Sequence, residues 1–372
     1  MEPALIFGVF LASLAQVVAG TAVPMFLSDA FGAGPFVIGL AGGLNQSVYF
    51  LTTLVSSVLV QMRFPLFLLA PCFFCVIYAA LPSLPLSLFV GLYVASAFFY
   101  ARYWAPIQDC LRSSRASSVN NYNLSFSAGI LLGTVSAGLL YERSRTLPFH
   151  AAAWLSLPVA LVFLVMARNI LKIRTKRTAQ VPAARQAFPA PQAWRIRTLF
   201  FLQFGTYGLL ISTFPKLCLD MPQKGYTPSV IAGLIAFYYA VRLAAFAALR
   251  NRSVVENRAV FLASCLATAA GISWMPLAPD ARWASAAMLL AGVPMSLAYH
   301  NSFLFHLRAG LPTELHQAII SAGALFGAFA TGILGERIGL GNAFFLYGLF
   351  IAAAGLALAA VLPDKEVSTV RT

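Results

Sequence analysis

Long apolar stretches separated by short polar ones recur along the whole chain. Backbone groups in lipid must hydrogen-bond within their own segment, and these stretches lack the short alternation of barrel strands, so each is predicted to be an α-helix. Twelve stretches reach the roughly 20 residues that cross a bilayer, near residues 4–27, 36–60, 65–82, 84–108, 124–141, 150–170, 198–218, 229–249, 258–278, 283–307, 317–334 and 342–362. The pattern predicts an all-α membrane protein with twelve transmembrane helices.

One apolar stretch occurs twice. SAGILLGTVSAGLLYER at 127–143 returns as SAGALFGAFATGILGER at 321–337, with nine of seventeen positions identical. Six spans separate the copies, so both should cross the membrane in the same direction. A second match, shifted by 191 residues, relates Pro24, Asp29 and Gly34 to Pro215, Asp220 and Gly225. The chain is therefore predicted to be two parallel six-helix repeats.

Parallel six-helix repeats related by an axis along the membrane normal are the architecture of major facilitator transporters. The sequence resembles the major facilitator superfamily over essentially its whole length. The resemblance implies a secondary transporter, not an enzyme, that alternates access around a central site. The superfamily's loop signature after the second helix is reduced here to Arg63.

The longest polar stretch, residues 167–197, is basic, contains three prolines and lies at the midpoint of the chain. It predicts an N-terminal bundle at 1–170, a cytoplasmic linker at 171–197 and a C-terminal bundle at 198–372. With a cytoplasmic N-terminus, seventeen Lys and Arg fall on the inner face and six on the outer face. Basic short loops are retained inside, so both termini are expected in the cytoplasm.

Composition agrees with this membrane class, because 60% of residues are hydrophobic and 10% are charged, against about 25% charged in ordinary globular domains. We expect a monomeric multi-pass protein of the cell (plasma or inner) membrane. The net charge of +14 is interpreted as a topology signal with possible contact to anionic membrane lipids. Nucleic-acid binding is not expected, since no soluble domain remains to carry it.

The repeated stretch contains small residues on one helix face. Gly129 and Gly133, and likewise Gly323 and Gly327, are spaced i, i+4, which lets a neighbouring backbone approach closely. We interpret them as the seam between the two halves. Each copy then ends in an acid–base pair, which we expect to pair across the pseudo-twofold axis when the outside is closed: Glu142 with Arg143, and Glu336 with Arg337.

Two arginines lie well inside predicted spans, away from both of their ends, where a charge costs about 2.5–3.5 kcal/mol or more. Arg242 lies well below the outer surface and, by the sequence match, Val48 occupies its place in the first half. Arg102 is nearer an inner end, where its side chain can also snorkel to the headgroups. Two arginines with no acidic residue in the middle of any span favour a small-molecule anion as substrate.

A set of polar residues on other spans outlines the predicted central site. Each is also compatible with interhelical hydrogen bonding, and His300 is a candidate for coupling protons or a neutral packing residue. The set comprises Gln16, Asn45, Gln46, Tyr49, Gln203, Tyr207, His300 and Asn301.

Enzyme, metal and cofactor chemistry find no support. No two histidines have the i, i+4 spacing of a helical metal site, and no Gly-rich phosphate loop follows a strand. The function predicted is alternating-access transport of a small organic or inorganic anion. Two alternatives stay open: an exporter of amphipathic drugs or lipids, and a non-transporting membrane receptor or assembly factor.

Overall fold

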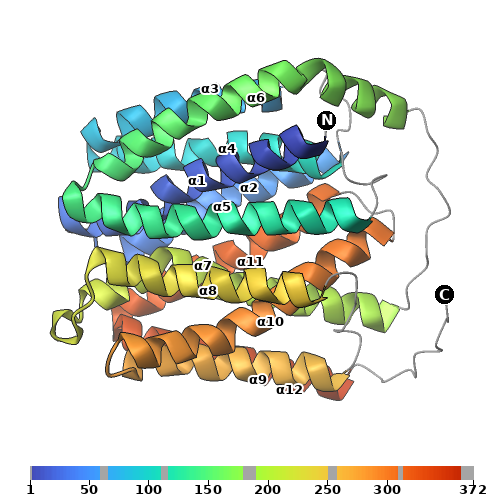
Figure 1. The fold of residues 1–372 in the computed structure, drawn as a ribbon. Helices are drawn as coiled ribbons and strands as arrows, with labels where there is room; N and C mark the ends of the chain where they lie inside the picture. The colour runs from blue at the N-terminus through green and yellow to red at the C-terminus, as the bar shows by residue number, and fades with distance from the viewer. Residues whose placement is uncertain are drawn as a thin grey trace.

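The computed structural model describes residues 2–58, 66–109, 116–178, 190–249, 258–308 and 313–361. These residues form twelve α-helices and three short 3-10 turns, with no strand among them (Figure 1). The helices are α1 (Glu2–Phe31), α2 (Pro35–Val58), α3 (Leu66–Ala80), α4 (Leu86–Asp109), α5 (Ala116–Arg143), α6 (Leu147–Thr178), α7 (Ala190–Leu219), α8 (Pro228–Leu249), α9 (Arg258–Trp274), α10 (Ala281–Arg308), α11 (Thr313–Ile338) and α12 (Leu340–Val361). The predicted all-α fold is confirmed. Eight helices in the described ranges are long and apolar enough to cross a membrane by length and composition.

The helices pack as two groups of six with matching internal contacts. The buried core of α1 to α6 and that of α7 to α12 are separate clusters, apart from one residue that each receives from the other group. In the first group α1 packs on α5, and in the second α7 packs on α11. Across the groups, α2 packs on α11 and α5 on α8; Figure 1 shows the latter pair side by side.

The two ends of the bundle carry different parts of the chain. Figure 1 shows that α1 begins and α12 ends at one end, which we call the terminal end. Helices α1, α5, α7 and α11 finish at the opposite end, which we call the distal end.

Helical structure extends into the stretch expected to be a linker. Helix α6 continues to Thr178 and α7 begins at Ala190, so both enter the interval 171–197. Residues 179–189 lie outside the described ranges. Lys and Arg are good helix formers, so the loss of apolar character marks the edge of the lipid and not the end of the helix.

The paired glycines of the repeat lie within each half, so their predicted place at the seam was wrong. A Cβ atom added at Gly133 would lie 2.8 Å from the Leu14 carbonyl oxygen of α1, and one at Gly327 would meet the Gly205 carbonyl oxygen of α7. Their partners Gly129 and Gly323 face α1 and α7 in the same way. The spacing shows that a backbone approaches closely, but it does not say which one.

The third glycine of each copy forms the contact between halves. A Cβ atom added at Gly138 of α5 would lie 2.9 Å from the Pro228 carbonyl oxygen of α8. One added at Gly332 of α11 would lie 2.8 Å from Gly39 Cα of α2. The repeated helix thus uses two glycines to pack within its half and one to meet the other half.

Candidate functional site

A central cavity with an empty volume of about 1210 Å³ lies between the two groups of helices. Residues of α1 to α5 line one side, and residues of α7, α8, α10 and α11 line the other. On α5 the lining comes from Tyr122, Phe126 and Ile130 and on α10 from Tyr299, all between the middle of these helices and the terminal end. The cavity therefore extends from the middle of the bundle toward the terminal end.

Arg242 of α8 is the one charged side chain among the described residues that line this cavity. Its side chain is 2% exposed. The guanidinium carbon lies 4.9 Å from the ring centroid of Tyr239, 5.5 Å from that of Phe126 and 5.6 Å from that of Tyr299. Its Nε and Nη2 atoms have no hydrogen-bond partner in the described part of the chain.

The rings around Arg242 offset only part of the cost of its burial. A desolvated cation–π contact contributes up to about 2 kcal/mol, but aromatic faces do not accept the in-plane N–H bonds of the guanidinium. Each unsatisfied buried donor costs about 1–3 kcal/mol, and more when charged. Nε and Nη2 lie on the same edge of the guanidinium, which is an edge that binds a carboxylate through two parallel hydrogen bonds. The site is thus chemically suited to an anion.

Sequence reasoning missed the aromatic surroundings of Arg242. Aromatic residues in an apolar membrane chain are usually packing residues. Phe126, Tyr239 and Tyr299 were therefore not predicted to belong to the site. One signal was available, because Tyr239 precedes Arg242 by three residues and therefore lies on the same helix face.

Several predicted polar residues do line the cavity, and most are hydrogen-bonded across helices. The Trp104 indole N–H donates to Gln16 Oε1 (3.0 Å), and Asn45 Nδ2 donates to the Tyr93 carbonyl (2.8 Å). Gln46 and Tyr207 also lie in the lining. The Tyr49 hydroxyl donates to Gln317 Oε1 of α11 (2.9 Å), which joins the two halves.

Other predicted site residues lie outside this lining: Arg102, Gln203, His300 and Asn301. The Arg102 guanidinium carbon lies 5.5 Å from the Phe98 ring centroid, on its own helix. Asn301 Nδ2 donates to the Leu297 carbonyl at 2.6 Å. On α10 the cavity face belongs to Tyr299, and the next two residues are rotated away from it because each helical step turns about 100°.

The contacts between the halves identify a different residue as the first-half counterpart of Arg242. Gly332 contacts Pro35 and Gly39 of α2, whereas Gly138 contacts Pro228 and Ala232 of α8. These pairs relate α2 to α8 by a shift of 193 residues, so Tyr49 and not Val48 corresponds to Arg242. Both Tyr49 and Arg242 line the cavity.

At the distal end two carboxylates bind the N-termini of helices of the opposite half. Glu142 Oε1 accepts a hydrogen bond from the Ser229 backbone N–H at the start of α8 (3.0 Å). Glu336 Oε2 accepts one from the Phe36 backbone N–H at the start of α2 (3.1 Å). The first N–H groups of a helix lack internal partners and carry partial positive charge.

The two glutamates were expected to pair with arginines at this end, but they bind backbone N–H groups instead. Arg143 and Arg337 are exposed, and no ion pair of either carboxylate occurs among the contacts of the described residues. An N-terminal N–H group is held in place by the helix, whereas an exposed arginine must be immobilised to form an ion pair. Each carboxylate therefore binds a helix of the opposite half.

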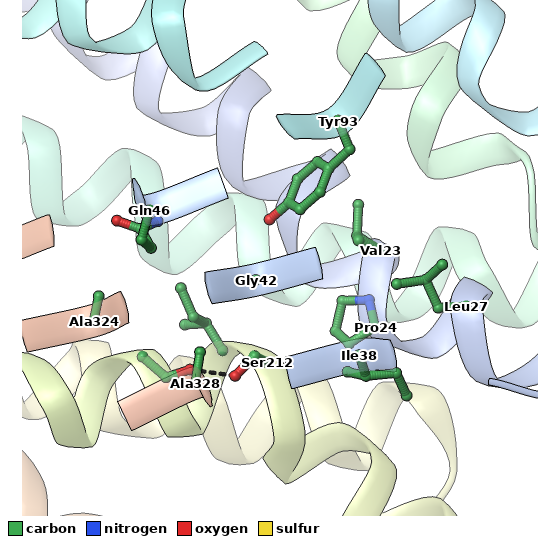
Figure 2. A pocket seen from close by; sticks show the side chains of 12 residues that line it. Val23, Pro24, Leu27, Ile38, Gly42, Gln46, Tyr93, Ser212, Ala324 and Ala328 are labelled. Atoms are coloured by element: carbon green, nitrogen blue, oxygen red, sulfur yellow. Dashed lines mark hydrogen bonds between the residues drawn. The ribbon is translucent and has the colours of Figure 1, made fainter. Parts of the chain in front are cut away.

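A smaller pocket of about 340 Å³ lies between the cavity and the distal end. It shares Gln46, Tyr93 and Ile211 with the cavity and adds Pro24 and Ser212. Figure 2 shows Tyr93 pointing from α4 toward α2, with Ser212 of α7 beside Ala328 of α11. The pocket continues the cavity in the distal direction.

A second polar cluster lies between α10 and α11. The Ser302 hydroxyl is 3.4 Å from His306 Nδ1 and 3.3 Å from His316 Nδ1, and the two imidazole centroids are 5.4 Å apart. Spacing along the chain did not reveal this pair because its members lie on different helices. The described residues contain no group of three or more His, Cys, Asp or Glu that could hold a metal ion.

Comparison with known proteins gives one family match. The model of the Major Facilitator Superfamily matches residues 5–314. No curated protein sequence matches the chain.

Several solved structures share its fold. The nucleoside transporter NupG has a TM-score of 0.74 at 10% identity, covering 98% of this chain and 99% of its own. A bacterial homolog of the human lysosomal transporter Spinster has a TM-score of 0.70 at 14% identity (97% and 96% covered). The human organic anion transporter MFSD10 has a TM-score of 0.64 at 12% identity (96% and 98% covered).

Proposed function

This chain belongs to the Major Facilitator Superfamily and is a multi-pass membrane transporter, not an enzyme, and we propose that it carries a small organic or inorganic anion. The observation that carries the proposal is Arg242, which is 2% exposed and has two guanidinium nitrogens without a partner in the described chain. A bound anion supplies the missing acceptor. The match to an organic anion transporter is a likeness of fold and adds no weight to the choice of substrate.

Transport by this carrier proceeds through alternating access, with 1–170 and 198–372 moving as two bundles about the cavity. In this proposal Glu142 and Glu336 act as latches, because their hydrogen bonds to α8 and α2 hold the distal end closed. Opening the distal end breaks both latches and separates Gly138 and Gly332 from their partners across the seam. Both termini lie in the cytoplasm, so the distal end is the outer one.

A thermal-shift screen of the detergent-purified protein tests the choice of substrate. Anions, cations and neutral compounds of similar size are compared, and hits are followed by uptake into proteoliposomes. We expect anions to raise the unfolding temperature. Arg242→Gln should weaken their binding roughly 10- to 150-fold, the equivalent of about 1.5–3 kcal/mol for a hydrogen bond to a charged group. Arg242→Lys should also bind less well, because an ammonium lacks the planar fork of a guanidinium.

Arg102→Gln is the matched control, since it removes the same charge from a residue outside the cavity lining. It should bind anions as the unmodified protein does. The proposal fails if only cations or neutral compounds stabilise the protein and Arg242→Gln binds them unchanged. That outcome favours an exporter of amphipathic drugs or lipids, for which the aromatic cavity wall is a suitable surface.

A further inference from the structure

The wall of the central cavity is far more aromatic than the chain as a whole. Eleven of its 23 lining residues are Phe, Tyr or Trp, whereas these types make up 13% of the sequence. A small inorganic anion or a short aliphatic acid leaves most of this surface without a partner. The enrichment therefore points to a substrate whose body has a large apolar face.

Neighbouring rings form a continuous belt along the cavity wall, and Arg242 lies against two of them. Trp104 and Phe126 of the first half lie edge to face at 5.1 Å between centroids. Phe126 and Tyr239 lie on Arg242, and Tyr239 contacts Tyr207 at 6.4 Å. A body bound next to Arg242 is thus in reach of rings from both halves. Aromatic groups gain from offset-stacked and edge-to-face contacts beyond the gain from burial alone.

The charge of the cavity limits the charge of the substrate. Arg242 is the one ionised side chain among the described lining residues, and the amides of Gln16 and Asn45 already accept or donate hydrogen bonds within the protein. A monoanion leaves the loaded cavity neutral. A dianion leaves one negative charge in the membrane interior without a counter-ion, which is strongly unfavourable.

From these three observations we infer that the preferred substrate is an aromatic monocarboxylate, with its carboxylate on Nε and Nη2 of Arg242 and its ring in the belt of Trp104, Phe126 and Tyr239. The inference rests on the proposed anion transport. Both nitrogens are shielded from solvent in the observed conformation, so the rings around them must move apart to admit the carboxylate.

Six compounds of similar size separate the contributions of ring and charge: benzoate, cyclohexanecarboxylate, acetate, phthalate, benzyl alcohol and benzylamine. Binding to the purified protein is measured by thermal shift and by calorimetry. Benzoate should bind about two- to twelvefold more tightly than cyclohexanecarboxylate, the range expected for one aromatic pair. Phthalate should bind at least about 50-fold more weakly than benzoate. Acetate, benzyl alcohol and benzylamine should give no shift.

Substitutions in the belt provide the matched variants. Phe126→Leu and Trp104→Leu keep an apolar side chain but remove the ring, so each should lower the affinity for benzoate toward that for cyclohexanecarboxylate. The affinity for cyclohexanecarboxylate should change less than twofold, which a variant that simply misfolds does not reproduce.

The possible failures are distinguishable. Equal or tighter binding of cyclohexanecarboxylate, acetate or phthalate overturns the aromatic monocarboxylate and leaves anion transport standing. Shifts with benzylamine or benzyl alcohol alone overturn both. If none of the six compounds gives a shift, the aromatic monocarboxylate is overturned. The broader anion screen then tests whether the protein transports anions at all.

Discussion

Glu142 at the end of α5 accepts a hydrogen bond from the backbone N–H of Ser229 in the first turn of α8, 87 residues later and in the other half of the protein. Glu336 at the end of α11 makes the equivalent bond to Phe36 at the start of α2. One sequence element, present twice, therefore joins the two halves at the distal end through two equivalent capping bonds.

The first prediction concerns these two latches. A carboxylate at a helix N-terminus contributes about 0.5–2 kcal/mol when it serves as a cap, and here the contact exists only while the distal end is closed. Glu142→Ala and Glu336→Ala should each shift the population toward the distal-open form about two- to thirtyfold. The double variant should shift it further.

Ser212→Cys reports on this equilibrium, because Ser212 lines the distal pocket and is 4% exposed in the closed form. In a background without the five native cysteines, its reaction with a membrane-impermeant thiol reagent should accelerate in the latch variants. Arg143→Gln and Arg337→Gln, one residue away, should react at the original rate. Equal acceleration by the arginine variants would contradict a capping role for the carboxylates.

A second prediction separates packing within each half from packing between halves. At Gly133 and Gly327 an added Cβ would meet the backbone of α1 or α7 at 2.8 Å or less. Overpacking typically costs about 1–3 kcal/mol, so Gly133→Ala and Gly327→Ala should lower the thermal unfolding temperature by several degrees. Gly91→Ala on α4, where nothing lies within 4 Å of the added atom, is the control and should not lower it, because Ala is the better helix former.

A third prediction applies the same substitution at the seam. Gly332→Ala places a methyl group against Gly39 of the other half, and this clash disappears when the distal end opens. Labelling of Ser212→Cys should therefore accelerate, while the unfolding temperature falls less than in Gly327→Ala. A larger loss of unfolding temperature without faster labelling would place the contact within a rigid core instead.

The fourth prediction concerns orientation. Ala183 belongs to the basic stretch at the midpoint, outside the described residues, and Ser144 lies exposed at the distal end after α5. The positive-inside rule places the first in the cytoplasm and the second outside. In intact cells, Ser144→Cys should react with an impermeant reagent and Ala183→Cys should react only after the membrane is opened. The reverse pattern inverts the topology.

The repeat in the sequence was sufficient to predict the fold but not the contacts of its glycines. Helical spacing shows which residues share a face, and a close approach of backbones follows from Gly129 and Gly133. It does not distinguish α1 of the same half from a helix of the other half. That choice depends on how twelve helices are arranged, which is a property of the whole packing.

The candidate site was predicted in part for a similar reason. Arg242 was found because a charge within a span is rare, and Gln16, Asn45 and Tyr207 were found because they are polar. The rings that surround Arg242 cannot be singled out in this way, because 60% of the residues in the chain are hydrophobic. His300, which does not line the cavity, is as polar as residues that do.

In the proposed anion transport, the charge of Arg242 makes the empty carrier electrically different from the loaded one. The residue lies fourteen positions into α8, about 21 Å along a helix axis, and so within the voltage drop. A full unit charge moved across 100 mV changes energy by about 2.3 kcal/mol. With a monoanion bound, the cavity has no net charge for the field to act on. If the substrate is the proposed monoanion, the membrane potential acts on the return of the empty carrier and not on the step that delivers the substrate.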